Sequence, residues 1–241
     1  MFNKFTSEIK SLFSIISICL VMTFASSSME AQRSEQDLST ARAGVILLKQ
    51  YPEGDWAMLL GEKAGTTQEW KSVNFPAGQY DSKDNRDLQN TALREMKEET
   101  GGPYSPLKSV TEYDIYPTYI DLVPPNGNIR LYFLVVNYLP EGVDVGKGTL
   151  GKAVKDAIAD PSLGSSYKEV GNYWAVCVKD VVKAAKRVAG SSNTAQKRQF
   201  TSRGIDQKLQ LEFYYMEALA KNVKPLCQIL QEITDLDYSK S

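Results

Sequence analysis

The sequence predicts a single α/β or α+β domain that follows an N-terminal targeting segment. Short apolar runs typical of strands alternate along the chain with stretches of helical periodicity, which favours strands and helices mixed in one fold. No internal repeat or low-complexity block is present, and 241 residues suffice for one well-buried domain with additional elements. Acidic and basic residues nearly cancel, so the overall charge does not favour binding to DNA or to an anionic membrane.

Histidine is absent from the sequence. This absence excludes catalytic Ser–His or Cys–His pairs, histidine-ligated zinc and a histidine general base. Of the three cysteines, Cys19 lies in the targeting segment, which leaves Cys177 and Cys227 either to pair or to remain isolated thiols. Acid–base and metal chemistry must therefore come from carboxylates, with Lys, Tyr or Cys as lesser candidates.

The start of the chain has the three parts of a secretory signal peptide. Lys4 and Lys10 precede the charge-free run Ser11–Ala25, and the small residues Ser26–Ser28 follow. We expect residues 1–28 to be removed on export, which implies a secreted or periplasmic protein. One alternative is an uncleaved membrane anchor, although the run is shorter than the roughly 20 residues that span a bilayer. A translation start at an internal methionine is the other.

After this segment, residues 29–42 predict a flexible polar lead-in, and residues 43–241 predict the domain itself. The first two apolar runs flank a turn-like stretch, Tyr51–Asp55, so they are expected to form a hairpin. A second turn is expected at Pro124–Gly127. The predicted strands are Gly44–Gln50, Trp56–Leu60, Tyr113–Asp121, Arg130–Tyr138 and Tyr173–Val178.

The second half of the chain is expected to carry an insertion and a C-terminal helical extension. Residues 141–166 are rich in Gly and Lys and predict the insertion, with a helical stretch at Lys152–Ala159. A helix is expected from about Lys179 to Val188, and Gly190–Gly204 is polar and basic, which predicts a mobile loop. Ile205–Ala220 then has the periodicity of an amphipathic helix.

Asp87–Thr100 is the clearest helix, and three glutamates on it form the main candidate site. Glu95, Glu98 and Glu99 stand at i, i+3 and i+4, so they fall within an arc of roughly 100° on one face. Three carboxylates so close together repel one another unless a cation lies among them. Mg²⁺ and Mn²⁺ prefer such hard oxygen ligands and commonly bridge them to substrate phosphates. Taken alone, the pattern also fits a solvated acidic helix.

The residues around these glutamates resemble the Nudix box. Arg94–Gly101, with the sequence REMKEETG, matches the helical part of that motif, R-E-U-x-E-E-x-G, where U is a bulky aliphatic residue. Phe75–Gly78, with the sequence FPAG, differs at one position from the FPGG that usually precedes the motif. The chain is therefore similar to Nudix hydrolases. The resemblance implies a Nudix-type α/β/α sandwich with a mixed sheet; it is strong only over Phe75–Gly102.

The loop before the helix departs from the family pattern in three places. Arg94 comes two residues later than the standard box allows when counted from Gly78. The position eight residues before Arg94, where the box has a glutamate, holds Arg86, and the last aliphatic position is a glycine. A partly buried guanidinium without a carboxylate partner is costly. We therefore expect Asp84 to pair with Arg94 and to brace the Gly78 turn against the glutamate helix.

The resemblance also implies roles for individual residues. Glu95, Glu98 and Glu99 are the expected catalytic residues, and the expected cofactor is Mg²⁺ or Mn²⁺. Glu98 and Glu99 would be its main ligands, and Glu95 a further ligand or the base that orients the attacking water. The carbonyl of Ala77 is expected to join the metal ligands. Glu169, just before the last predicted strand, is another candidate ligand, although an ordinary surface position explains it equally well.

The leading hypothesis is a metal-dependent hydrolase that cleaves the diphosphate linkage of a nucleoside diphosphate joined to another group. The loop pattern G-x2-D-x2-D at Gly78, Asp81 and Asp84 is weakly similar to coenzyme A pyrophosphatases and to some Nudix enzymes for inosine diphosphate or RNA caps. We expect a small nucleotide-type substrate, with an RNA cap less favoured and no DNA. The alternative is a Nudix-fold module that binds nucleotide or RNA without cleaving it, but such modules typically lack box glutamates. A structural exported protein with an incidental acidic helix is the third hypothesis.

Overall fold

The computed structural model describes residues 38–65, 69–123, 128–138, 148–191, 194–202 and 205–238. The compact unit described below runs from Ser39 to Ser241. The expected signal peptide, most of the lead-in and the expected turn at 124–127 lie outside the described residues. Within the described ranges, no helix is both long enough and apolar enough to cross a membrane.

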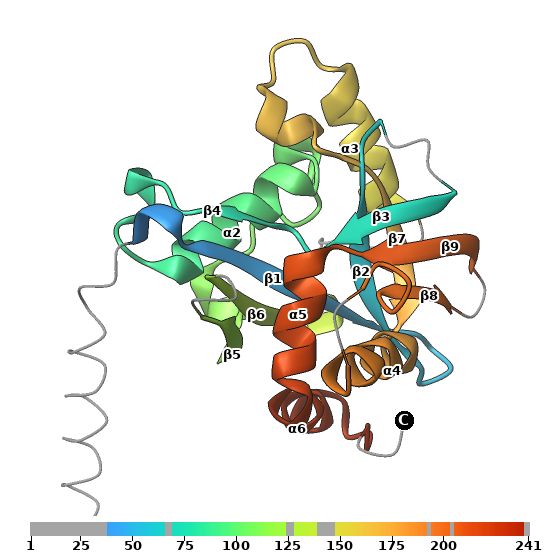
Figure 1. Ribbon diagram of the computed structural model, residues 1–241. Coiled ribbons are helices and arrows are strands. Elements are labelled where there is room, and N and C mark those ends of the chain that lie inside the picture. Colours follow the sequence, from blue (N-terminus) through green and yellow to red (C-terminus); the bar gives the residue numbers. More distant parts are fainter. Residues whose placement is uncertain are drawn as a thin grey trace, which may run out of the picture. The chain divides into compact units, whose positions relative to one another are not determined.

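A mixed sheet forms the centre of this unit (Figure 1). Its strands are β1 (Arg42–Gln50), β2 (Trp56–Lys63), β3 (Trp70–Asn74), β4 (Ala77–Gln79), β5 (Tyr116–Leu122), β6 (Ile129–Val135), β7 (Val170–Cys177), β8 (Gln199–Ser202) and β9 (Ile205–Leu211). They follow the order β5-β6-β1-β2-β3-β9-β8, with β4 paired to β1 and β7 to β2. β1 runs parallel to β6 and β3 parallel to β9, whereas the remaining pairs are antiparallel.

Helices cover both faces of the sheet. They are α2 (Leu88–Glu99), α3 (Thr149–Ala159), α4 (Val178–Ala189), α5 (Phe213–Lys221) and α6 (Val223–Thr234). Side chains along a strand alternate between the two faces. Val45 and Leu47 of β1 accordingly belong to one apolar cluster with Met96 of α2, whereas Ile46 and Leu48 belong to a second cluster with α4, α5 and α6. The predicted α/β/α layering with a mixed sheet is confirmed.

The glutamate helix α2 forms where the sequence predicts it. The Asp87 side chain accepts a hydrogen bond from the backbone N–H of Gln89 at 2.8 Å, which caps the first turn. At the other end, the Thr100 hydroxyl donates to the Met96 carbonyl at 2.7 Å, and Gly101 follows with φ of +107°. Only glycine adopts this backbone conformation without strain, so the helix ends there.

The predicted helix at Ile205–Ala220 is wrong in its first half. Residues Ile205–Leu211 form strand β9, and helix α5 starts only at Phe213. β9 pairs in parallel with β3 and buries Leu209 and Leu211. The expected mobile loop at Gly190–Gly204 likewise contains strand β8, which pairs with β9. The C-terminal part of the chain therefore extends the sheet as well as adding helices.

Candidate active site

Helix α2 and strand β4 bring the candidate site together. α2 packs against β1 and β4, so its glutamates face the backbone that follows Phe75. A Cβ on Gly78 would overlap the Glu95 carboxyl group. A glycine at this position therefore lets the Glu95 carboxyl group lie directly against the β4 backbone.

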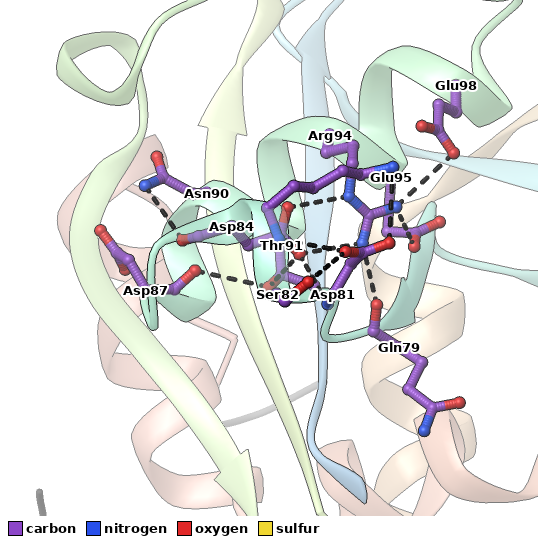
Figure 2. A network of polar contacts seen from close by, with 11 residues as sticks. Gln79, Asp81, Ser82, Asp84, Asp87, Asn90, Thr91, Arg94, Glu95 and Glu98 are labelled. Atoms are coloured by element: carbon purple, nitrogen blue, oxygen red, sulfur yellow. Dashed lines mark hydrogen bonds and ion pairs between the residues drawn. The ribbon is translucent and has the colours of Figure 1, made fainter. Parts of the chain in front are cut away.

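Arg94 joins the loop before the helix to the acidic face (Figure 2). Its Nε and Nη2 donate to the two carboxylate oxygens of Asp84 at 2.9 and 3.0 Å, and Nη2 also donates to the Gln79 carbonyl at 2.9 Å. Nη1 donates to Glu95 at 2.5 Å and lies 3.6 Å from a carboxylate oxygen of Glu98. The expectation that Asp84 replaces the missing box glutamate as the partner of Arg94 is confirmed.

Asp84 is held from several sides and is only 3% exposed. It accepts hydrogen bonds from the Asp81 backbone N–H at 3.0 Å and from the Thr91 hydroxyl at 2.9 Å. Burial alone would raise the pKa of Asp84, but the bonds from Arg94, Asp81 and Thr91 hold that pKa below its usual value. Asp84 therefore remains a carboxylate that is able to neutralise the Arg94 guanidinium.

Two left-handed residues turn the longer loop back toward the helix. Ser82–Asp84 form a single 3-10 turn, and Asn85 and Arg86 follow with φ of 56° and 59°. Arg86, which stands where the standard box has its glutamate, is exposed. The chain thus folds Asp84 inward before Arg86, and it is Asp84 that reaches Arg94.

Glu99 is the most deeply buried of the three glutamates, with 4% of its surface exposed. Among the described residues, its Oε2 atom has no hydrogen-bond partner. Burial raises the pKa of Glu99 well above its usual value, and repulsion from Glu95 and Glu169 adds to this, whereas the Ala77 backbone N–H opposes it. An unsatisfied buried carboxyl group is costly, and a bound cation would remove that cost.

Glu95 and Glu98 lie closer to solvent, each with 13% of its side chain exposed. Burial raises the pKa of Glu95, and Glu98 and Glu169 add to the rise, although Arg94 acts against it. Glu169 is exposed beyond the 3-10 turn Ser165–Lys168, yet it is near enough for its charge to act on both Glu95 and Glu99. The negative charges of four acidic side chains therefore interact here: Glu95, Glu98, Glu99 and Glu169.

The types of donor in this cluster suit a hard divalent cation, although their present orientations do not enclose one. No three acidic or cysteine side chains of the described residues are arranged to hold a metal ion. Arg94 accounts for part of this, because it binds Glu95 directly and lies near Glu98. The unpartnered Oε2 of Glu99 supports the fit, because carboxylate oxygens are the preferred ligands of Mg²⁺ and Mn²⁺. Binding would require Glu95 and Glu98 to turn from the guanidinium.

The backbone of Ala77, another predicted ligand, lies against this cluster. Its N–H faces the Glu99 carboxyl group and lowers the pKa of that group. Its carbonyl accepts a hydrogen bond from the Tyr215 hydroxyl at 3.4 Å. Tyr215 belongs to α5 and is 138 residues away in sequence. Tyr215 could not be recognised from the sequence, because a tyrosine within an apolar helical pattern has no feature that separates it from other core aromatics.

An open pocket of about 600 Å³ lies beside α2. Glu98 and Arg94 line it together with Lys97 of the same helix, Lys108 from the following loop and the ring of Tyr167. The pocket thus places two lysines and an aromatic ring beside one edge of the acidic cluster.

Arg130 and Tyr119 are engaged with neighbouring side chains. Arg130 binds both carboxylate oxygens of Asp121, at 2.8 and 2.9 Å, and its guanidinium lies 3.7 Å from the centre of the Tyr119 ring.

Cys177 and Cys227 are both free thiols, so the two do not form a disulfide.

These features define an α/β protein whose acidic helix is anchored by an arginine at one end of a mixed sheet. The family model of the NUDIX domain matches residues 39–148, a stretch that includes β1 to β6 and α2. Residues 39–148 of the chain thus match the NUDIX domain. No curated protein matches the chain.

Solved structures to which the chain is similar are also Nudix proteins. A MutT/nudix family protein from Enterococcus faecalis is 16% identical over 86% of this chain and 74% of its own, with a TM-score of 0.41. A Nudix hydrolase from Alicyclobacillus acidocaldarius is 14% identical over 82% of this chain and 97% of its own, with a TM-score of 0.39. For a Nudix hydrolase from M. smegmatis the identity is 17%, over 40% of this chain and 61% of its own, with a TM-score of 0.31.

Proposed function

We propose that this protein is a Mg²⁺- or Mn²⁺-dependent hydrolase that cleaves the diphosphate linkage of a nucleoside diphosphate joined to another group. The observation that carries the proposal is the Glu99 carboxyl group, which is buried without a hydrogen-bond partner for Oε2 beside Glu95, Glu98 and Glu169. Without a cation, this arrangement destabilises the fold, because a carboxyl group is buried unpaired and the acidic side chains repel one another. A divalent cation shared with a substrate diphosphate would stabilise it.

Each side chain has a part in this proposal. Glu98 and Glu99 hold the cation, with the Ala77 carbonyl and Glu169 as further ligands. Glu95 is a ligand or the base that accepts a proton from the attacking water. When bound, the ion supplies a lowered pKa for water and neutralises charge on the phosphoryl oxygens. The ion pair between Arg94 and Asp84 fixes the position of the loop relative to helix α2.

The proposed substrate is a small nucleotide-type molecule, and the wall of the pocket beside Glu98 supports this. Lys97 and Lys108 can attract phosphate oxygens, and the Tyr167 ring offers a surface for stacking. Both lysines line the same pocket as Glu98.

The experiment that tests the proposal is a substrate panel with Mg²⁺, with Mn²⁺ and with EDTA. The panel includes coenzyme A, NADH, ADP-ribose, dinucleoside polyphosphates, inosine diphosphate and capped RNA. We expect hydrolysis of at least one compound, with release of a nucleoside monophosphate, only in the presence of a divalent cation. Tight nucleotide binding without turnover across the panel would instead indicate a non-catalytic binding module.

A further inference from the structure

The carbonyl of Ala77 is contacted by a residue from outside the NUDIX domain. Tyr215 lies on α5, beyond the matched residues 39–148, and is 3% exposed. Its hydroxyl donates to the Ala77 carbonyl at 3.4 Å, and its ring packs edge-on against Phe75 with 6.0 Å between ring centres. The C-terminal part of the chain thus contacts two residues of the FPAG segment, Phe75 and Ala77.

Ala77 is restrained from three directions. Its N–H acts on the Glu99 carboxylate of α2, and its carbonyl is bonded by Tyr215 of α5. On a third side, Gly44 of β1 is opposite Ala77, and a Cβ on Gly44 would overlap the Ala77 side chain. Pairing with β1, in which the Val45 N–H donates to the Pro76 carbonyl at 3.0 Å, holds this backbone on one side, and the hydroxyl of Tyr215 and the carboxyl group of Glu99 add contacts to Ala77 itself.

Arg42 acts on the hydroxyl group of Tyr215. The guanidinium of Arg42, at the start of β1, interacts with the Tyr215 hydroxyl and also acts on the charge of Glu99. A guanidinium can only donate hydrogen bonds. A carbonyl can only accept, so the Tyr215 hydroxyl hydrogen is donated to the Ala77 carbonyl, and only the Tyr215 oxygen is left for the guanidinium.

We propose that Tyr215 is a positioning residue of the metal site, which orients the Ala77 carbonyl so that its second lone pair is available to the ion. A carbonyl oxygen has two lone pairs, and one hydrogen bond leaves the other free. Groups that orient metal ligands in this way typically contribute about 10- to 100-fold to metal affinity. The inference rests on the proposed function, and it makes the C-terminal segment part of the site.

Tyr215→Phe tests this inference, because phenylalanine keeps the ring and its contact with Phe75 but lacks the hydroxyl. We expect the dissociation constant for Mn²⁺, measured by electron paramagnetic resonance on the full chain, to rise about tenfold. Tyr214→Phe is the matched control: Tyr214 is the next residue on the same helix and is 51% exposed, so its variant should bind Mn²⁺ as the wild type does.

Kinetics distinguish positioning of the ligand from a general loss of structure. In Tyr215→Phe, the Mn²⁺ concentration for half-maximal activity should rise about tenfold, whereas kcat at saturating Mn²⁺ should stay within about twofold. A fall in kcat that saturating metal does not restore would contradict the inference. So would unchanged Mn²⁺ affinity.

Arg42→Gln provides a second variant at an exposed position, where folding is not at risk. It removes a positive charge that acts on Glu99 but keeps the Tyr215 hydroxyl, so Mn²⁺ affinity should not fall. If the wild type binds Mn²⁺ and hydrolyses a substrate but Tyr215→Phe matches it, this inference fails and the proposed function stands. If the wild type binds no Mn²⁺, both fail.

Discussion

At the scale of single residues, the pairing of Asp84 with Arg94 shows how the site tolerates an altered motif. The sequence indicated that a carboxylate had to replace the missing glutamate, because Arg94 needs a partner when it is partly buried. The fork of two hydrogen bonds, at 2.9 and 3.0 Å, is a geometry that carboxylates and guanidinium groups favour. Tyr215 could not be found in the same way, because its contact with Ala77 depends on how α5 packs.

Asp84→Asn is expected to destabilise the fold and to weaken metal binding. Removing the charge leaves Arg94 without its buried partner, which costs about 3 kcal/mol in the free energy of unfolding. Urea unfolding measures this directly. Because Arg94 would then be free to bind Glu95 and Glu98 more strongly, the Mn²⁺ dissociation constant should also rise.

The matched control for that variant is Asp206→Asn, at an exposed position on β9. Its free energy of unfolding should stay within about 0.5 kcal/mol of the wild type. Equal stability of Asp84→Asn and Asp206→Asn would contradict the bracing role of Asp84.

At the scale of elements, the parts predicted correctly are those whose pattern is local. Helix α2 carries its own cap at Asp87 and its own stop at Gly101, and β1 and β2 form a hairpin over a turn rich in turn-forming residues. The interpretation of Ile205–Ala220 as one helix failed because β9 and α5 are separated only by Glu212. β9 is a strand because it pairs with the edge of β3. This pairing is a tertiary contact, so the local sequence pattern does not predict it.

The loop before α2 allows a prediction about stability. Arg86 has φ of 59°, a left-handed conformation that costs a residue with a side chain about 1–2 kcal/mol. Arg86→Gly should therefore increase the free energy of unfolding by about 1 kcal/mol, as measured in urea. Lys83→Gly, in the right-handed 3-10 turn of the same loop, should lower it instead. A loss of stability in Arg86→Gly would show that its side chain makes a contribution that exceeds the backbone strain.

At the scale of the whole molecule, the mixture of strands and helices followed from the sequence pattern, and the α/β/α layering followed from the resemblance to Nudix hydrolases. The extension of the sheet by β8 and β9 could not be predicted, because β9 pairs with β3, a strand more than 130 residues earlier in the chain. This long-range pairing brings α5, and with it Tyr215, to the FPAG segment. The sequence could therefore predict the glutamates of the candidate site but not its support from the C-terminal part.

Export is the proposal for the start of the chain, and it concerns the protein as a whole. Residues 1–28 have the pattern of a signal peptide, so cleavage should follow the apolar run. Mass spectrometry of the protein from its native compartment should give an N-terminus between about Ser26 and Gln32. Recovery of intact Met1 from a soluble cytoplasmic fraction would overturn this proposal.

The most direct test of the central claim is the turnover of Glu98→Gln and Glu99→Gln on the substrate that the panel identifies. Glutamine keeps the size and helix propensity of glutamate but removes the charge that holds a metal ion. We expect kcat to fall at least about a thousandfold in both variants, as is typical when electrostatic stabilisation of this kind is lost, with the fold intact by circular dichroism. Glu232→Gln, at an exposed position on helix α6, should keep full activity. Full activity in both Glu98→Gln and Glu99→Gln would contradict the assignment of hydrolysis to this site.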